Sequence, residues 1–154
     1  MATVVPGKLI FITQPRTYGE LVEQYLIKTY KSARPIELEL YDGDEPLVTS
    51  IRNPYALILE WFILNPEWKN FLEFIEKYDH SHFLNGGNTL FQFPGDPDIL
   101  RDEKIKEHLA ETLGEAVDLA VPPIIEYRDH YGPDEIEMVK KRFAYDLEEY
   151  QYEF

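Results

Sequence analysis

The chain has 154 residues and a mass of 18.2 kDa, and its 29 acidic and 15 basic side chains give a formal charge of -14. This length predicts a single domain, 1–154, and a hydrophobic content of 44% is enough for that domain to bury a core. Nucleic acids and anionic membranes bind cationic surfaces, so the acidity argues against either as a direct partner. The lack of cysteine excludes disulfides, thiolate metal sites and cysteine nucleophiles.

The chain shows no sign of a targeting or membrane segment. Residues 1–8 have neither a basic region nor a long apolar run, which argues against a signal peptide. The most apolar run, 55–64, is about half a bilayer span and contains Glu60, so it predicts a core helix. We therefore expect a soluble, cytoplasmic protein with no membrane partner.

The first part of the chain predicts a strand, a helix and a second strand. Lys8–Thr13 is a short apolar run of β-forming residues. Thr17 and Glu20 have the spacing of a capping box, and apolar residues then recur at helical spacing as far as Tyr30. Alternation over 36–41 predicts the second strand, which would run parallel to the first if the two are neighbours.

Two Asn-Pro dipeptides predict helix starts in the middle of the chain. Asn53 and Asn65 each place a capping side chain before a proline suited to the first helical position. The helix over 55–64 is apolar nearly all round, and the second helix, containing 68–75, has one apolar face. The turn residues 85–88 lie between two apolar runs and predict a hairpin.

The last third of the chain predicts two further helices. A long helix is expected to begin at 96–97 and to run to about Ala120, before the prolines 122–123. Another begins at 132–133 and leads into 143–154, an acidic segment with five aromatic residues. We expect that segment to pack as a last helical turn, with a mobile docking tail as the alternative. The elements together predict a single compact α+β domain, mostly helical, with about five helices and a small sheet of about three to four short strands.

The negative charge is concentrated in the C-terminal half. Residues 1–77 carry 11 acidic and 8 basic side chains, and residues 78–154 carry 18 and 7. One side of the predicted long helix presents a row of acids: Glu103, Glu107, Glu111, Glu115 and Asp118. Carboxylates four residues apart on a helix repeat every ~6 Å, which is close to the phosphate spacing of a nucleic-acid strand. Like charges at this spacing repel, so helix stability alone does not favour the row.

These acids predict partner binding. With Glu148 and Glu149 they form the candidate binding residues of a non-enzymatic acidic protein that acts on a macromolecular partner with a basic surface. The most economical role is an inhibitor or nucleic-acid mimic, of immunity or anti-defence type, that blocks a nuclease or nucleic-acid-binding complex. The plainer interpretation is that the row is the solvated face of a helix. A structural or virion-type assembly subunit, joined through its Tyr- and Phe-rich surfaces, is a further alternative.

Candidate catalytic chemistry is confined to one segment. In an extended chain His80 and His82 project to one face, with Asp79 as a supporting partner and Asp129 or His130 as a distant third ligand. A metal-dependent hydrolase using His80 and His82 is therefore a third alternative, although the segment equally suits a polar connection between elements. The sequence lacks G-x-S-x-G and Walker motifs, so neither catalysis nor a cofactor is expected.

Overall fold

The computed structural model describes residues 2–14, 16–79 and 96–154. Contacts divide the chain into two compact units. Unit 1 comprises Met1–Arg52 and Leu90–Pro122, and unit 2 comprises Asn53–Thr89 and Pro123–Phe154. Each unit is therefore assembled from two separate stretches of the chain.

Unit 1 is built around a mixed sheet that, in the described residues, has five strands in the order β3-β1-β2-β4-β5. The strands are β1 (Ala2–Val5), β2 (Leu9–Ile12), β3 (Arg34–Ile36), β4 (Leu47–Ile51) and β5 (Asp98–Arg101). β1 is antiparallel to both β2 and β3, whereas β2, β4 and β5 are parallel to one another. The carboxyl ends of these three parallel strands therefore lie at one edge of the sheet.

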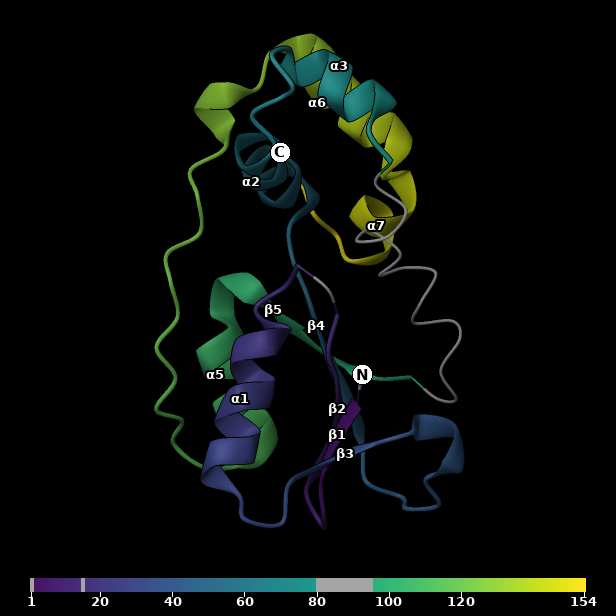
Figure 1. Cartoon of the computed structure of the whole chain (residues 1–154), viewed down its shortest axis with the longest axis vertical. Helices are drawn as coiled ribbons and strands as arrows, with labels where there is room; N and C mark the ends of the chain where they lie inside the picture. Colours follow the sequence, from purple (N-terminus) through teal and green to yellow (C-terminus); the bar gives the residue numbers. More distant parts are fainter. Residues whose placement is uncertain (1, 15, 80–95) are drawn as a thin grey trace. The chain divides into compact units, whose positions relative to one another are not determined.

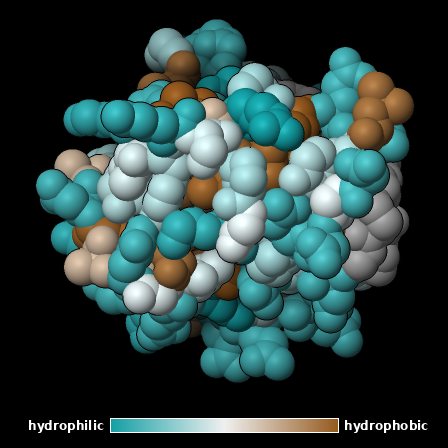
Figure 2. All heavy atoms as spheres, turned by 90° about the horizontal axis from the view of Figure 1, so that it is seen from below, coloured by the Kyte–Doolittle hydropathy of each residue, from teal (hydrophilic) through white to brown (hydrophobic). Residues whose placement is uncertain are grey.

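The two faces of the sheet are covered differently. Helices α1 (Gly19–Thr29) and α5 (Ile105–Leu113) lie on the same face (Figure 1), where Phe11 and Val48 are completely buried. Alternate residues point the other way and form a second apolar cluster. Its buried members are Ala2, Val4, Ile10 and Ile12. Figure 2 shows the outer surface of the chain seen from below, where most side chains are hydrophilic and apolar ones are scattered among them.

Unit 2 is helical in the part that the structure describes. Its helices are α2 (Pro54–Leu64), α3 (Phe71–Lys77), α6 (Pro133–Arg142) and α7 (Ala144–Glu149). α3 and α6 run side by side (Figure 1). The core between the helices is rich in aromatic side chains, including Tyr55, Phe74, Tyr127 and Tyr131. No helix in the described ranges is both long enough and apolar enough to cross a membrane.

The fold is α+β, but the expected number of elements was wrong. The described residues contain five strands and six α-helices in place of three to four strands and about five helices. The strand expected over 36–41 is a 3₁₀ turn at Leu38–Leu40, preceded by the short β3, which pairs with β1. The parallel neighbour of β2 is β4, whose polar Thr49 and Ser50 are completely buried.

The long helix expected over 96–120 was also wrong. Its first residues form β5, a 3₁₀ turn follows at Asp102–Lys104, and α5 ends at Leu113. Gly114 adopts φ 68° and its N–H caps the carbonyl of Glu111, and this left-handed conformation ends the helix. The last helix likewise divides into α6 and α7 at Phe143. The hairpin predicted around 85–88 lies outside the described residues.

One of the two predicted Asn-Pro helix starts is confirmed. The Asn53 side chain accepts a hydrogen bond of 3.0 Å from the Tyr55 N–H and caps α2. The following helix is capped instead by Asn70, which accepts from the Glu73 N–H across 2.8 Å. Asn65 donates to the carbonyl of Trp61 across 2.7 Å, so this side chain closes the end of α2 and does not begin α3.

Candidate functional site

All seven predicted partner-binding residues are exposed, but they do not form one row. Glu103, Glu107, Glu111, Glu115 and Asp118 belong to unit 1, and Glu148 and Glu149 belong to unit 2. Of the five in unit 1, only Glu107 and Glu111 lie on α5 itself. Of the expected row, only this pair therefore keeps the four-residue spacing on one helix.

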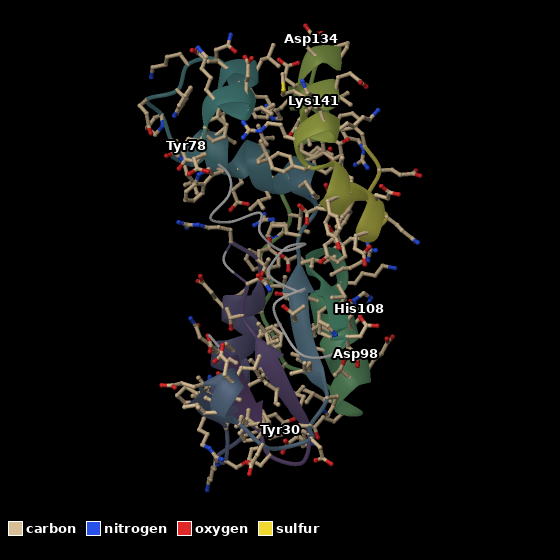
Figure 3. The ribbon with its side chains drawn as sticks, turned by 90° about the vertical axis from the view of Figure 1, so that its right-hand side faces the viewer. Tyr30, Tyr78, Asp98, His108, Asp134 and Lys141 are labelled. Atoms are coloured by element: carbon tan, nitrogen blue, oxygen red, sulfur yellow. The ribbon has the colours of Figure 1, made fainter. Side chains whose placement is uncertain are left out.

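Glu115 interacts with other residues of unit 1. The hydroxyl of Tyr30 donates a hydrogen bond to its carboxylate, and the Lys8 ammonium lies 3.8 Å from it. Tyr30 directly follows α1 and is labelled at the bottom of Figure 3. Because its charge is partly balanced within the unit, Glu115 is a weaker candidate for partner binding than the α5 pair.

A shallow acidic pocket lies beside the start of α5. Its volume is about 320 Å³, and its lining residues are Asp102, Glu103, Ile105, Lys106, Glu107, Leu119 and Val121. Two of the predicted residues, Glu103 and Glu107, therefore border one concave surface. Two exposed carboxylates against the one exposed ammonium of Lys106 make this surface suited to a cationic group.

Asp102 is a functional candidate that sequence reasoning missed. It is only 2% exposed, and it accepts a hydrogen bond of 2.8 Å from the backbone N–H of Tyr18, just before α1. The Tyr18 hydroxyl donates to the carbonyl of Pro122 across 3.0 Å, and the Arg52 guanidinium lies 5.0 Å from the centre of the Tyr18 ring. This polar cluster lies at the carboxyl edge of the parallel strands, the usual position of ligand sites in α/β sheets.

Unit 2 contains a larger pocket beside α6 and α7. Its volume is about 540 Å³, and its lining residues are Tyr55, Lys140, Ala144, Leu147, Glu148, Tyr152, Glu153 and Phe154. The predicted residue Glu148 borders this pocket, whereas Glu149 does not. No local sequence pattern indicates this pocket, since its wall combines Tyr55 of α2 with residues up to Phe154, almost 100 residues later.

Two of the lining residues, Tyr55 and Phe154, belong to a cluster of four aromatic rings. Tyr55 stacks on Tyr127 at a centroid distance of 5.9 Å, and Phe154 meets Tyr55 edge to face at 5.0 Å. Tyr131 completes the cluster, with its ring 5.5 Å from that of Tyr55. Burial raises the pKa of Tyr55 and, more strongly, that of Tyr131. The phenols of Tyr55 and Tyr131 are therefore neutral at physiological pH.

The metal hypothesis receives no support from the residues described. No group of three or more His, Cys, Asp or Glu side chains converges within 2–14, 16–79 and 96–154. Asp129 and His130 are exposed in the 3₁₀ turn Arg128–His130. His80 and His82 lie outside the described residues.

The negative charge is shared by both units. Unit 1 carries 15 acidic and 9 basic side chains, and unit 2 carries 14 and 6, so the net charges are -6 and -8.

No protein-family model matches the chain, and neither a curated protein nor a solved structure matches it. Functional inference therefore rests on the surfaces of the chain itself.

Proposed function

We propose that this protein is a non-enzymatic acidic binding protein that acts on a macromolecular partner with a basic surface, most economically as an inhibitor in the cytoplasm. The observation that carries the proposal is the acidic pocket at the start of α5, where the exposed residues Glu103 and Glu107 border one hollow. Such a surface attracts a cationic partner through its field and excludes nucleic acid by the same repulsion.

The geometry favours complementarity to a basic protein surface over imitation of a nucleic-acid strand. A mimic of a nucleic-acid strand needs carboxylates at regular intervals. Here α5 supplies only Glu107 and Glu111 before it ends at Gly114. A protein surface requires no fixed interval, because lysine and arginine side chains adapt to the carboxylates that they meet. A nuclease or nucleic-acid-binding complex remains the kind of partner that we propose.

The experiment compares two double variants with equal charge changes. Glu107→Gln with Glu111→Gln removes two carboxylates from α5, and Glu37→Gln with Glu39→Gln removes two exposed carboxylates from another part of unit 1. The readouts are capture of a partner from extract and inhibition of purified basic nucleic-acid-binding proteins over a range of salt concentrations.

We expect the α5 variant to weaken binding by about tenfold or more and to reduce its salt dependence. The control should bind like the unaltered protein. Equal loss in the two variants would mean that only total charge matters, and unchanged binding by the α5 variant would remove this surface from the proposal.

A further inference from the structure

The pocket of unit 2 combines an aromatic wall with an acidic rim. Tyr55 is 1% exposed and forms part of the wall, Tyr152 and Phe154 add two further rings, and Glu148 and Glu153 supply carboxylates. At about 540 Å³ the pocket has the size of sites that hold small molecules or single side chains of a partner.

The rim carboxylates are uncompensated. Glu148 and Glu153 are exposed, and neither has an ion-pair partner within the described ranges. Lys140, the base at this pocket, has its ammonium 3.4 Å from Glu137, one turn earlier on α6. The pocket therefore joins a negative field to apolar rings, which favours a cation with a flat, weakly hydrated surface.

The hydroxyl of Tyr55 differs from those of the two phenols beside it. Tyr127 accepts from Asn53 across 3.1 Å, and Tyr131 donates to the Tyr55 carbonyl across 2.8 Å. The Tyr55 hydroxyl is not among the fully buried, unpaired polar atoms of the described residues. Because Tyr55 lines the pocket, its hydroxyl is a candidate acceptor for an N–H of an occupant.

We propose that this pocket receives an arginine side chain of the basic partner, an inference that rests on the proposed function and specifies the chemistry of recognition. The planar guanidinium stacks on aromatic rings and presents several N–H donors to carboxylates at once. A lysine ammonium is a compact, strongly hydrated charge and uses the rings less well. The pocket accordingly selects arginine over lysine.

The probe is N-acetyl-arginine amide, with N-acetyl-lysine amide as the comparison, titrated into the isotope-labelled full chain and followed by NMR. We expect saturable shifts at the amides of Leu147, Tyr152 and Phe154, and tighter binding of the arginine compound. Glu148→Gln with Glu153→Gln should weaken its affinity by about tenfold, the effect of losing charged hydrogen bonds. Lys140→Gln should strengthen the affinity by about twofold, because it removes a repelling charge.

Glu67→Gln with Glu76→Gln is the matched control, since it removes two exposed carboxylates of unit 2 that do not line the pocket. Absence of shifts in the unaltered protein, equal affinity for the two compounds, or equal weakening by the control would each overturn the proposal. Glu107→Gln with Glu111→Gln should leave the titration unchanged. If that variant loses the macromolecular partner while the unaltered chain does not bind the arginine compound, the proposed function stands and the arginine pocket fails.

Discussion

The hydroxyl of Tyr131 donates a hydrogen bond of 2.8 Å to the backbone carbonyl of Tyr55. The two rings also meet edge to face, with their planes at 82°. Tyr55 lies in the first turn of α2, and Tyr131 lies just before α6. One side chain thus joins two stretches of unit 2 that are 76 residues apart in the chain.

The buried tyrosines predict a loss of stability in alkali. Burial raises the pKa values of Tyr131 and Tyr150 in the folded chain. Because the folded pKa exceeds the unfolded one, the stabilisation is complete below the unfolded value of about 10 and is lost as the pH rises through the folded value. We expect the melting temperature to fall steeply above about pH 10, as measured by circular dichroism.

Tyr131→Phe tests whether ionisation of Tyr131 causes the alkaline fall in melting temperature. The variant should lose about 1–2 kcal/mol of unfolding free energy near neutral pH, because the buried hydrogen bond from the Tyr131 hydroxyl to the Tyr55 carbonyl is lost. It should also show a shallower alkaline decline, since one buried phenol is absent. An unchanged slope would contradict the assignment of the decline to Tyr131.

Two asparagine side chains that cap helices predict different stability losses. Asn70→Ala should cost about 1 kcal/mol, the usual value for an exposed helix cap. Asn53→Ala should cost about 2–3 kcal/mol, because it removes the cap of α2 and also leaves the buried Tyr127 hydroxyl without its donor. Urea unfolding measures both values. Equal losses would contradict the double role of Asn53.

The same side chains show how far local sequence signals reach. Asn53 and Asn65 occur in identical Asn-Pro dipeptides, and only Asn53 begins a helix. The outcome at Asn65 is decided by its hydrogen bond back to Trp61, which depends on where α2 ends and is not encoded in the dipeptide. Gly114 is a local signal for the end of α5. Apolar residues continue at helical spacing beyond Gly114, however, and this pattern favoured a longer helix.

The strands that were missed share a different cause. β4 contains Thr49 and Ser50, and their complete burial becomes possible only once neighbouring strands and α1 cover them. Thr49 then donates to the carbonyl of Ile12 across 2.8 Å. The exposure of the seven predicted acids could be predicted from the sequence, because charged side chains favour solvent. The two pockets could not be predicted, because their walls depend on tertiary contacts between residues far apart in the chain.

Gly19 of α1 lies so close to Ser50 of β4 that a substitution can test this contact sterically. A Cβ at this position would lie 2.7 Å from the Ser50 Oγ and 3.0 Å from the Thr17 Oγ1. These two oxygens are themselves hydrogen-bonded across 2.7 Å, so Ser50 cannot move freely. Gly19→Ala should cost about 1–3 kcal/mol in urea unfolding, the usual penalty of overpacking.

Two controls separate this clash from other effects of the substitution. Adding Ser50→Ala to Gly19→Ala should recover part of the loss, because the closest atom is removed. Gly114→Ala meets no atom within 4 Å and should lose only about 1 kcal/mol through its positive φ. A Gly19 variant as stable as the unaltered protein would show that α1 can shift away from the sheet.

We expect the stability of the C-terminal end of α3 to depend on Arg142, the last residue of α6. Its guanidinium donates to the carbonyl of Ile75 across 2.7 Å and also to that of Glu76, so one side chain caps the C-terminal end of α3. Arg142→Met keeps the apolar stem and removes the donors, and it should cost about 1–2 kcal/mol with faster amide exchange at the end of α3. Lys141→Met, at the neighbouring position of α6 labelled in Figure 3, is the control with the same charge change and should have little effect. If both variants were equally destabilised, the loss would come from charge at the end of α6, and the capping role of Arg142 would be wrong.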